Sequence, residues 1–484
     1  MKKIITCLCL LLLIQIQFAF AQTEDWDKAQ SRTLREALMP GLIASGETLL
    51  SNLTLMLINT AIGFPWATPT AESIRSNFTN PWEWEDSDGF LVNQLGHPYQ
   101  GAQYFTAGRV NGFGFYSSVF FSILGSLTWE AFGESKQASI NDFITTVPGS
   151  MAMGEMLYRL HLEAHAAGAS LPLVFLVSPM GGFHMIVTNG RQIPDTGQYL
   201  YQLQTFVGAG RSTTRHSLAG NDGYEFSSDG SFGVIGLRLI YGDPFEQSTA
   251  VPFRHFELSV CLGTHLGRYT NIRLISDGYL FSFSPINTER NRMSTGLSMH
   301  LDYISLGDFN IWNSTIDMYS NALSWTVKFQ HRFSENTVME LRCHLGFTFV
   351  GASNYYSEEG AWAERGGTTS LVNELRNYGY GTNSKLFFSL RNNMLGKFAA
   401  DLLFYTLRPY PTKSIPLTVH SSTTTPPRGT VFWLFADFTY SRHIVNSFSL
   451  GVTASFAREW GRFQNHPNTR KVNDSTSLFV AWNM

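Results

Sequence analysis

The stretch Ser447–Phe456 reads SFSLGVTASF, in which apolar residues alternate with small or polar ones. Successive side chains of a β-strand point to opposite faces of the sheet, so this stretch predicts a strand with one apolar and one polar face. The same alternation occurs in His255–His265, Leu297–Tyr303 and Met339–Phe349. Because the pattern begins near Gln198, we expect strands from there to the end of the chain.

The lengths of these segments and of their connections favour a barrel in a membrane. A soluble β-sandwich would show the same alternation. However, the segments run about ten to thirteen residues, the length that a tilted strand needs to cross a bilayer. Short turns also alternate with long polar loops, which is typical of outer-membrane barrels. The turns are predicted at 334–336, 393–396 and 443–445, and the loops at 351–381, 409–430 and 461–473.

We therefore predict an all-β transmembrane outer-membrane barrel of about twelve antiparallel strands, preceded by an N-terminal α-helical hairpin module. The predicted strands are 198–210, 230–241, 253–267, 278–285, 293–305, 321–333, 337–350, 382–393, 397–408, 431–442, 446–459 and 474–484. The segment 278–285 has the weakest pattern, and Ile311–Tyr319 could add a short strand, so ten and fourteen strands stay open. An even number places both barrel ends on the periplasmic side.

The composition fits a chain with one surface in lipid. Charged residues make up 15% of the sequence and aromatic residues 14%, whereas a soluble domain usually has about 25% charged residues. Aromatic residues gather at the edges of membrane barrels. The net charge of −3 gives no sign of nucleic-acid binding. Cys261 and Cys343 lie in predicted strands and are expected to be small apolar fillers.

The N-terminus predicts export. Lys2 and Lys3 precede an apolar run, and Ala19-Phe20-Ala21 matches the small-x-small cleavage rule. We expect residues 1–21 to be a cleaved signal peptide. The expected destination is the outer membrane of a Gram-negative bacterium, where the partners would be membrane lipid and the barrel-assembly machinery.

Two further apolar stretches are long enough to be considered as membrane helices. Gly41–Phe64 is interrupted by Glu47, Asn52 and Asn59, whereas Gly112–Trp129 is uncharged but contains several glycines and serines. Both patterns favour helices that are buried against protein or lie at an interface. The second stretch could alternatively span a membrane.

Residues 97–160 contain the most specific string in the chain. It comprises HPY at 97–99 with Gly101, GSLTWE at 125–130 with GE at 133–134, SIND at 139–142 and GEMLYR at 154–159. The string resembles the pattern of an uncharacterised bacterial family, domain of unknown function 3943, although Ala138 and Ser150 replace a proline and a glycine of that pattern. The resemblance implies an outer-membrane location and no particular activity.

The same region predicts a helical hairpin. One apolar helix would span Tyr104–Phe132, and a second would begin after Ser139, with Asp142 as its capping-box partner, and reach Glu163. Pro148 inside the second helix predicts a kink or a break. The expected organisation is a signal peptide (1–21), a helical or irregular segment (22–96), the hairpin (97–165), a linker that could include a strand (166–197) and the barrel (198–484).

Acidic residues gather at the predicted turn of this hairpin. The candidates for catalysis are His97, Glu130, Glu134, Asp142 and Glu155. Of these, Glu130, Glu134 and Asp142 would lie near the turn and could bind a divalent metal or act as acid and base. Glu155 would lie two to three turns away along the axis. The alternative is structural, because these carboxylates could cap helices or pair with arginines.

The polar face of the predicted strands supplies a second set of candidates. Its charged and histidine residues are His255, Glu257, His265, His300, Asp302, Lys328, Glu340, Arg342, His344, Lys385, Arg391 and Asp401. Such groups commonly fill the lumen of a small barrel. Two histidines beside a carboxylate could instead hydrolyse lipid, but no serine stands out as the nucleophile.

Three functions remain open from the sequence. The first is an envelope protein whose helical module binds or scaffolds, which is favoured because the common hydrolase and nucleotide-binding motifs are absent. The second is a membrane-embedded enzyme that modifies lipid or lipopolysaccharide with the acidic hairpin or the lumen histidines. The third is a narrow pore.

Overall fold

The computed structural model describes most of the chain in two compact units, Met1–Gln198 and Tyr199–Met484. The described residues are 34–84, 88–189, 199–219, 225–246, 248–265, 269–307, 316–356, 374–410, 417–419, 422–424, 428–464 and 468–483. The predicted signal peptide, residues 1–21, lies outside them. We call the described part of the first unit, residues 34–189, the helical unit, and that of the second unit the barrel.

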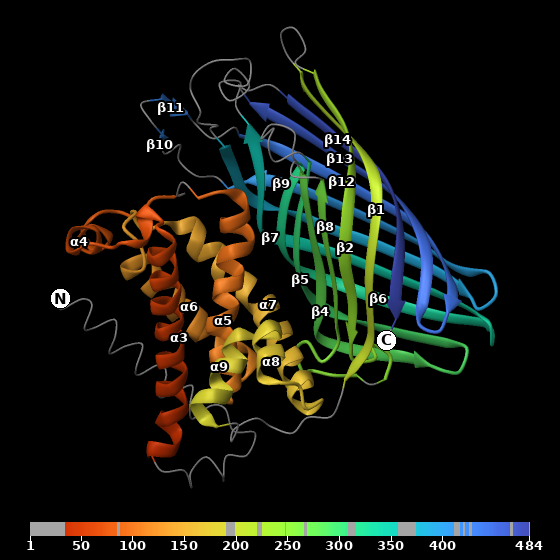
Figure 1. Ribbon diagram of the computed structural model, residues 1–484, viewed down its shortest axis with the longest axis horizontal. Coiled ribbons are helices and arrows are strands. Elements are labelled where there is room, and N and C mark those ends of the chain that lie inside the picture. The colour runs from red at the N-terminus through yellow and green to blue at the C-terminus, as the bar shows by residue number, and fades with distance from the viewer. Residues whose placement is uncertain are drawn as a thin grey trace. The chain divides into compact units, whose positions relative to one another are not determined.

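The barrel is a closed antiparallel sheet of twelve strands, as predicted (Figure 1). Its strands are β1 (Leu200–Ala219), β2 (Glu225–Tyr241), β3 (Phe256–His265), β4 (Tyr269–Asn287), β5 (Asn291–Leu306), β6 (Ile316–Ser334), β7 (Thr337–Tyr356), β8 (Glu374–Asn392), β9 (Gly396–Pro409), β12 (Arg428–Val445), β13 (Phe448–Gln464) and β14 (Asn468–Asn483). Each strand pairs with its neighbour in sequence, and the small hairpin of β10 (Leu417–Val419) and β11 (Ser422–Thr424) stands between β9 and β12.

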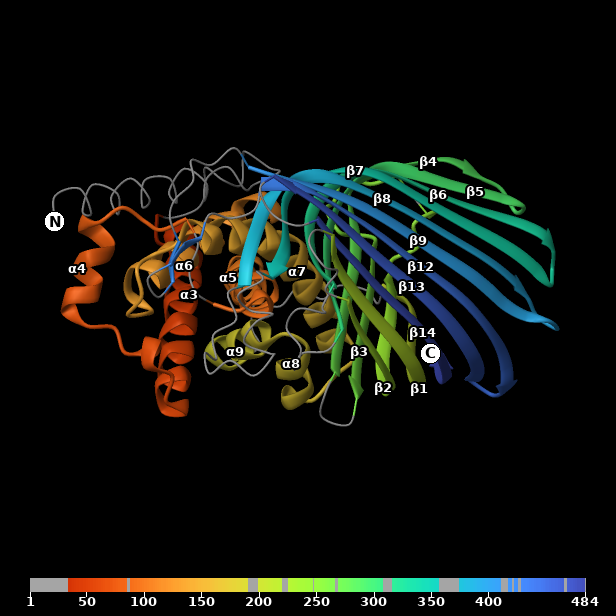
Figure 2. The same cartoon turned by 90° about the horizontal axis from the view of Figure 1, so that it is seen from above.

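The sheet closes where the first strand meets the last. β1 pairs with β14 from Gln204 opposite Asn483 to Ala219 opposite Asn468. Figure 2 shows this closed sheet from above. Closure satisfies the backbone hydrogen bonds of both strands that would otherwise form open edges, which is the condition for a sheet to exist in lipid.

The alternation seen in the sequence separates the two faces of the wall. On β13, Leu450 is 51% exposed, whereas Thr453 lines the lumen. On β7 and β14, Leu345 and Leu478 are likewise exposed apolar side chains. The wall therefore has apolar residues on its outer face, while the lumen contains most of the barrel's buried charges.

Three details of the barrel differ from the prediction. The weak fourth segment is a full strand, β4, whose pairing shifts register between Tyr279 and Phe281 and again between Phe283 and Ile286. These bulges explain the weak pattern, because an extra residue interrupts alternation. Of the possible short strand Ile311–Tyr319, residues 316–319 begin β6, and residues 311–315 lie outside the described part of the chain. The predicted loop 461–473 is mostly paired strand, because backbone pairing continues there without apolar alternation.

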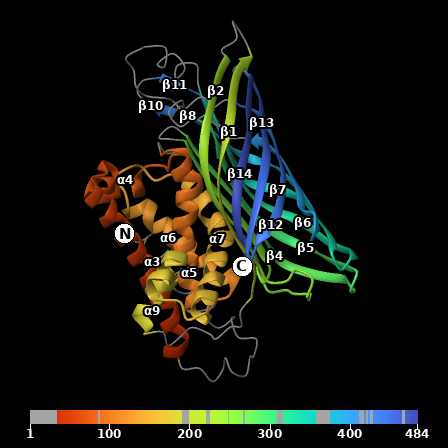
Figure 3. The same ribbon diagram turned by 45° about the vertical axis from the view of Figure 1, so that its right-hand side comes forward.

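The helical unit contains more helices than the predicted hairpin (Figure 3). They are α3 (Leu34–Ile62), η1 (Pro65–Ala67), α4 (Ala71–Thr79), η2 (Val92–Gly96), α5 (His97–Val110), α6 (Phe115–Phe132), α7 (Ile140–Ala166), α8 (Leu171–Val177) and α9 (Pro179–Thr188). The predicted helix Tyr104–Phe132 is thus two helices. Gly112, with φ of +86°, makes the turn between them, a conformation that favours glycine. α7 runs through Pro148 without a break.

The region expected to be a linker also proved helical. Residues 171–188 form α8 and α9, and no described residue of 166–189 is in a strand. The apolar run Leu171–Val177 is as compatible with a short helix as with a strand, so periodicity alone could not separate them. Pro172 at the start of α8 and Pro179 at the start of α9 favour helix initiation.

Glycines of the HPY–GEMLYR string allow α5 to pack closely against α6 and α7. A Cβ added to Gly125 of α6 would lie 2.3 Å from the ring of Tyr104. One added to Gly101 would lie 2.7 Å from Thr146, and one added to Gly154 would lie 2.8 Å from Phe105. Each distance is too short for a side chain, so these glycines set the spacing of the three helices.

Candidate functional site

Glu130 and Asp142 meet at the start of α7. The backbone N–H of Ser139 donates to Glu130 Oε2 at 2.8 Å, and the Ser139 hydroxyl donates to Asp142 Oδ2 at 2.5 Å. Both carboxylates are 2% exposed. Negative groups at a helix N-terminus satisfy free backbone N–H groups and interact favourably with the helix dipole. The geometry therefore lets Glu130 cap the start of α7, whereas Asp142 accepts from the side chains of Ser139 and Asn141.

The other three hairpin candidates also have protein partners. His97 Nε2 lies 3.5 Å from Asp142 Oδ1, and the indole of Trp129 donates to Glu134 at 2.7 Å. Glu155 is fully buried and lies apart from the cap, where it accepts from Arg109 Nε at 2.7 Å and from Arg159 Nε at 2.9 Å. These are the arginine pairs of the structural alternative.

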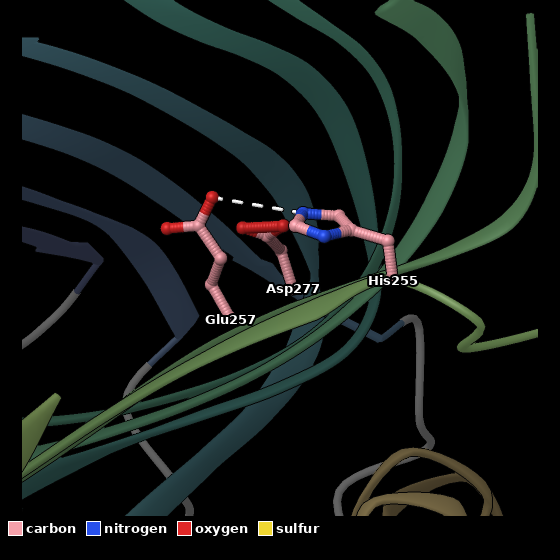
Figure 4. Close-up of side chains that lie close together, drawn as sticks. All are labelled: His255, Glu257 and Asp277. Carbon is pink, nitrogen blue, oxygen red and sulfur yellow. Dashed lines mark ion pairs between the residues drawn. The ribbon is translucent and has the colours of Figure 1, made fainter. Parts of the chain in front are cut away.

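The metal candidates of the hairpin do not form a ligand cluster. Among the described residues, the group of histidine, cysteine or carboxylate side chains whose ligand atoms all lie within 4.8 Å of one another is His255, Glu257 and Asp277 (Figure 4). His255 directly precedes β3, Glu257 belongs to β3, and Asp277 faces Glu257 across the β3–β4 pairing. This group lies in the barrel, far along the sequence from Glu130.

A lysine ammonium already lies among the three potential ligands. Lys328 Nζ of β6 is 2.7 Å from His255 Nε2, 2.8 Å from Glu257 Oε1 and 2.9 Å from Asp277 Oδ1. An ammonium has three N–H donors, and here each has an acceptor. Lys328 thus supplies the positive charge that a metal would bring, and a metal would first have to displace it. The residues present do not fit a resident metal ion.

A second buried lysine organises the neighbouring part of the lumen. Lys385 Nζ of β8 donates to Asp302 at 2.6 Å and contacts His300 Nδ1 at 2.9 Å. The hydroxyl of Tyr405 also donates to Asp302, at 3.1 Å. His300 and Asp302 are fully buried. The buried charges of Lys385 and Asp302 are tolerated away from water only because they are paired and hydrogen-bonded in this way.

The lysine contact fixes the tautomer of His300. Because an ammonium can only donate, His300 Nδ1 must accept, and its Nε2 carries the proton that is donated to Ser298 Oγ at 2.8 Å. A serine nucleophile needs the opposite arrangement, in which the histidine accepts the hydroxyl proton. Ser298 is also fully buried. The pair therefore lacks the geometry of an activated serine.

Ion pairs join opposite walls of the barrel. Arg273 Nη2 of β4 lies 2.7 Å from Asp437 Oδ2 of β12, and five strands separate β4 from β12 in either direction around the barrel. Arg238 of β2 lies 3.6 Å from Asp401 of β9. The two walls therefore approach to within the reach of two side chains, and the lumen is bridged.

A cavity of about 300 Å³ in the lumen is lined in part by the residues of both bridges. Its lining mixes both charges with aromatic rings and includes Arg238, Arg342, Lys397, Glu340, Asp401, Phe206, Phe329 and Phe388. Lining of this kind suits a small molecule that has both charged and apolar groups.

Most of the lumen residues named from the sequence belong to this network. His344 Nδ1 is hydrogen-bonded to the Thr326 hydroxyl at 2.8 Å. Arg342 forms an ion pair with Glu257. Glu340 accepts a hydrogen bond from Gln330 at 3.1 Å. Arg391 is exposed near a short turn. The side chain of His265 lies outside the described part.

Sequence reasoning missed several network members. Asp277, Arg273 and Asp437 were absent from the candidates, although all three lie in strands. Asp277 precedes the bulges of β4, which obscured its facing. Arg273 and Asp437 can be recognised as partners only from their contact across the barrel, which no local sequence pattern predicts.

His161 of α7 is a buried titratable group that the sequence did not single out. It is fully buried, and neither ring nitrogen has a hydrogen-bond partner among the described residues. Gly181 packs directly against the ring, since a Cβ there would lie 2.4 Å from Nδ1. Burial, with smaller contributions from His165 and His184, lowers the pKa of His161 from 6.5 to about 4. The ring is therefore neutral near pH 7.

The family resemblance found in the string at 97–160 is confirmed by a wider match. The model of the family described as Domain of unknown function (DUF3943) matches residues 81–180. This region includes α5, α6 and α7 with their close-packed glycines and capping carboxylates. No curated protein matches the chain.

Solved structures similar to this chain are membrane barrels of low sequence identity. An outer-membrane channel from Pseudomonas putida F1 is 12% identical, with a TM-score of 0.25, over 60% of this chain and 100% of its own. The outer-membrane protease OmpT from Escherichia coli is 9% identical, with a TM-score of 0.24, over 60% and 99%. The TodX monoaromatic hydrocarbon channel, as a deletion mutant, is 10% identical, with a TM-score of 0.24, over 62% and 93%. Sequence identities and TM-scores this low carry no information on the activity of this chain.

Proposed function

We propose that the protein is an integral outer-membrane barrel with a bridged lumen, which acts by binding or scaffolding through its helical unit and its lumen cavity. The observation that carries this proposal is the Arg273–Asp437 pair, which joins opposite walls at 2.7 Å. A conducting pore needs a continuous path for ions, whereas this pair and Arg238–Asp401 cross the lumen.

The outer surface of the wall supports the membrane location. Its exposed apolar residues include Val207, Ile235, Trp325, Leu345, Phe347, Leu450 and Leu478. A soluble barrel would leave this surface in water, which is unfavourable for so large an apolar area. The predicted signal peptide supplies the export route, and the barrel-assembly machinery is the expected partner for insertion.

The site geometry supports binding over lipid modification. His300 donates to Ser298 and so cannot accept its proton, while Lys328 occupies the position that a metal ion would take. The hairpin carboxylates contact helix ends and arginines. The cavity, in contrast, offers both charges and aromatic surface to a small amphipathic molecule.

The test is conductance of the purified full-length protein in planar bilayers of phosphatidylethanolamine and phosphatidylglycerol. We expect the wild type to insert without a stable open level, and the variant in which Arg238, Arg273, Asp401 and Asp437 are all replaced by alanine, and which therefore lacks both bridges, to conduct. A steady open level of the wild type would contradict the bridged lumen. In parallel, the protein should fractionate with the outer membrane and migrate differently before and after boiling.

Mass spectrometry of membrane lipids decides between binding and catalysis. Strains with and without the gene should have the same lipid and lipopolysaccharide species if the protein binds or scaffolds. A modified species that depends on the gene, and that disappears in an Asp302→Asn or Glu130→Gln strain, would instead establish the enzyme.

A further inference from the structure

On the long helix α3, large apolar side chains are exposed and several polar side chains are buried. Its exposed side chains include Leu42, Leu49, Leu53, Leu57 and Ile58. Its buried side chains include Glu47, Thr48, Asn52 and Asn59. A helix of a water-soluble domain has the opposite arrangement, with an apolar face toward the core.

Two residues of the buried polar face, Glu47 and Asn52, are hydrogen-bonded to other helices of the helical unit. Glu47 contacts His184 Nδ1 of α9 at 2.8 Å and accepts from Asn111 Nδ2 at 2.6 Å. Asn52 donates to the carbonyl of Gly125 at 2.9 Å and to the Thr128 hydroxyl at 3.0 Å, both in α6. Polar contacts, together with the apolar cluster of Ala44, Phe113 and Phe121, thus attach α3 to its neighbours. Interhelical hydrogen bonds of this kind hold helices together where the solvent is lipid.

The exposed face is free of charge over the length of a bilayer. Leu38–Ile62 is the one stretch of the described helices that is long and apolar enough to cross a membrane, and 28% of it is buried. Its 25 residues span about 37 Å, against about 30 Å of hydrocarbon. Its one charged side chain, Glu47, is 4% exposed. The exposed Thr60 hydroxyl donates to the carbonyl of Met56, so it needs no water.

The C-terminal end of α3 has the residues expected at a membrane surface. Phe64 and Trp66 stack with ring centroids 5.4 Å apart, and Lys136 Nζ lies 5.9 Å from the ring of Trp66. Aromatic and basic side chains are enriched where a membrane helix meets water. On α6, Ser118, Ser122 and Ser126 are buried together with Phe121 and Trp129, while Phe132 is 47% exposed.

We propose that the exposed apolar face of α3 lies in the acyl-chain region of the lipid bilayer, so that this helix attaches the helical unit to the membrane. The face defined by Leu42, Leu49, Leu53, Leu57 and Ile58 contacts lipid, and the Glu47–His184–Asn111 contacts keep the single charge inside the unit. Trp66 and Lys136 mark the membrane–water boundary at the end of the helix.

Spin labelling of the full-length protein tests this contact. Cys261 and Cys343, the two cysteines outside the predicted signal peptide, are replaced by alanine, and single cysteines are placed at Leu49 and Leu57, about two turns apart on the same face. The protein is reconstituted in vesicles of phosphatidylethanolamine and phosphatidylglycerol. Collision rates of each label with oxygen, which concentrates in lipid, and with a water-soluble nickel chelate are then compared.

We expect the Leu49 and Leu57 labels to collide several-fold more often with oxygen than with the nickel chelate. A label at Arg75, an exposed residue of α4, is the matched control and should show the reverse preference. Labels on α3 that resemble the Arg75 label would overturn the proposal. So would labels shielded from both reagents, because that result means that protein, either the barrel or a second copy, covers the face.

A label at Leu450 keeps this test separate from the proposed function. Leu450 lies on the outer face of β13, and its preference for oxygen reports the barrel in lipid. A Leu450 label in lipid with α3 labels in water would reject the inference on α3 alone. A Leu450 label in water would reject the membrane barrel itself.

Discussion

Glu130 and Asp142 show what buried acidic residues do in the helical unit. Both are 2% exposed, and both bind Ser139 at the start of α7. A carboxylate in this position satisfies N–H groups that the helix itself leaves free. The same residues were candidates for metal binding because acidity alone does not distinguish a ligand from a cap.

Replacing Glu130 with glutamine separates these two roles. Glu130→Gln should lower the free energy of unfolding by about 1–2 kcal/mol, because the amide is a weaker acceptor for Ser139 N–H and carries no charge for the helix dipole. Chemical unfolding of wild type and variant, with and without Mg²⁺ or Zn²⁺, measures this. Glu72→Gln in the exposed first turn of α4 is the control and should change stability by less than about 0.5 kcal/mol. A metal that stabilises the wild type alone would restore the metal hypothesis.

The buried ring of His161 makes the helical unit sensitive to acid. Its pKa is about 4 in the folded protein, against 6.5 for an ordinary histidine. Above pH 6.5 the ring is neutral in both states. As the pH falls from 6.5 toward 4, the unfolded state takes up the proton first, so up to about 3 kcal/mol of stability is lost over this window.

The helical circular dichroism signal during thermal unfolding at pH 7 and pH 5 measures this loss. His161→Leu should unfold with a smaller shift between the two pH values than the wild type, because its side chain cannot be protonated. Equal shifts in wild type and variant would mean that other groups account for the acid sensitivity.

At the scale of elements, the glycines of α5, α6 and α7 decide how closely the helices pack. Gly125→Ala would place a Cβ 2.3 Å from the Tyr104 ring, and should cost about 1–3 kcal/mol, as overpacking of a core does. Gly46→Ala in α3 is the matched control, because nothing lies within 4 Å of its added Cβ. That change should be neutral or stabilise by up to about 1 kcal/mol through helix propensity. Equal effects in a thermal unfolding assay would contradict close packing.

The sequence predicted the strands better than the helices, for physical reasons. Alternation with period two is strong where one face meets lipid and the other the lumen, so all twelve strands were located. In the helical unit, apolar residues lie on both exposed and buried faces, so periodicity could not mark helix ends. The turn at Gly112 was therefore missed inside the largely apolar stretch 104–132.

The candidate site was predictable in its residue types but not in its contacts. Lys328, His255 and Glu257 were assigned to the lumen from alternation, and they do lie together. Their partner Asp277 precedes two bulges, and the Arg273–Asp437 pair depends on how the whole barrel closes. Contacts between strands that are not neighbours follow from closure and tilt, which local sequence does not specify.

At the scale of the whole molecule, the Arg273–Asp437 pair makes a clear prediction. Asp437→Ala leaves the partly buried Arg273 without this counter-charge and should destabilise the barrel by about 2–3 kcal/mol. Replacing both, as Arg273→Met with Asp437→Leu, should recover most of that loss, because no charge is then left unpaired.

The urea concentration at which the heat-modifiable form is lost measures both variants. Asp474→Ala is the control, because its pair with Arg458 joins neighbouring strands and Asp474 is 38% exposed. That change should cost less than about 1 kcal/mol. Similar losses for Asp437→Ala and Asp474→Ala would mean that the cross-barrel pair does not hold the walls together.

The pairing of β1 with β14 also governs when the barrel can fold. Gln204 meets Asn483, so the first strand must wait for the last strand to be synthesised before it finds its partner. Contacts so distant along the chain form slowly, because the loop between them must close first. Until then, β1 presents an unpaired edge that can recruit another chain. A chain truncated before Asn468 would keep both edges open, and we expect it to aggregate or be degraded instead of accumulating as a smaller barrel.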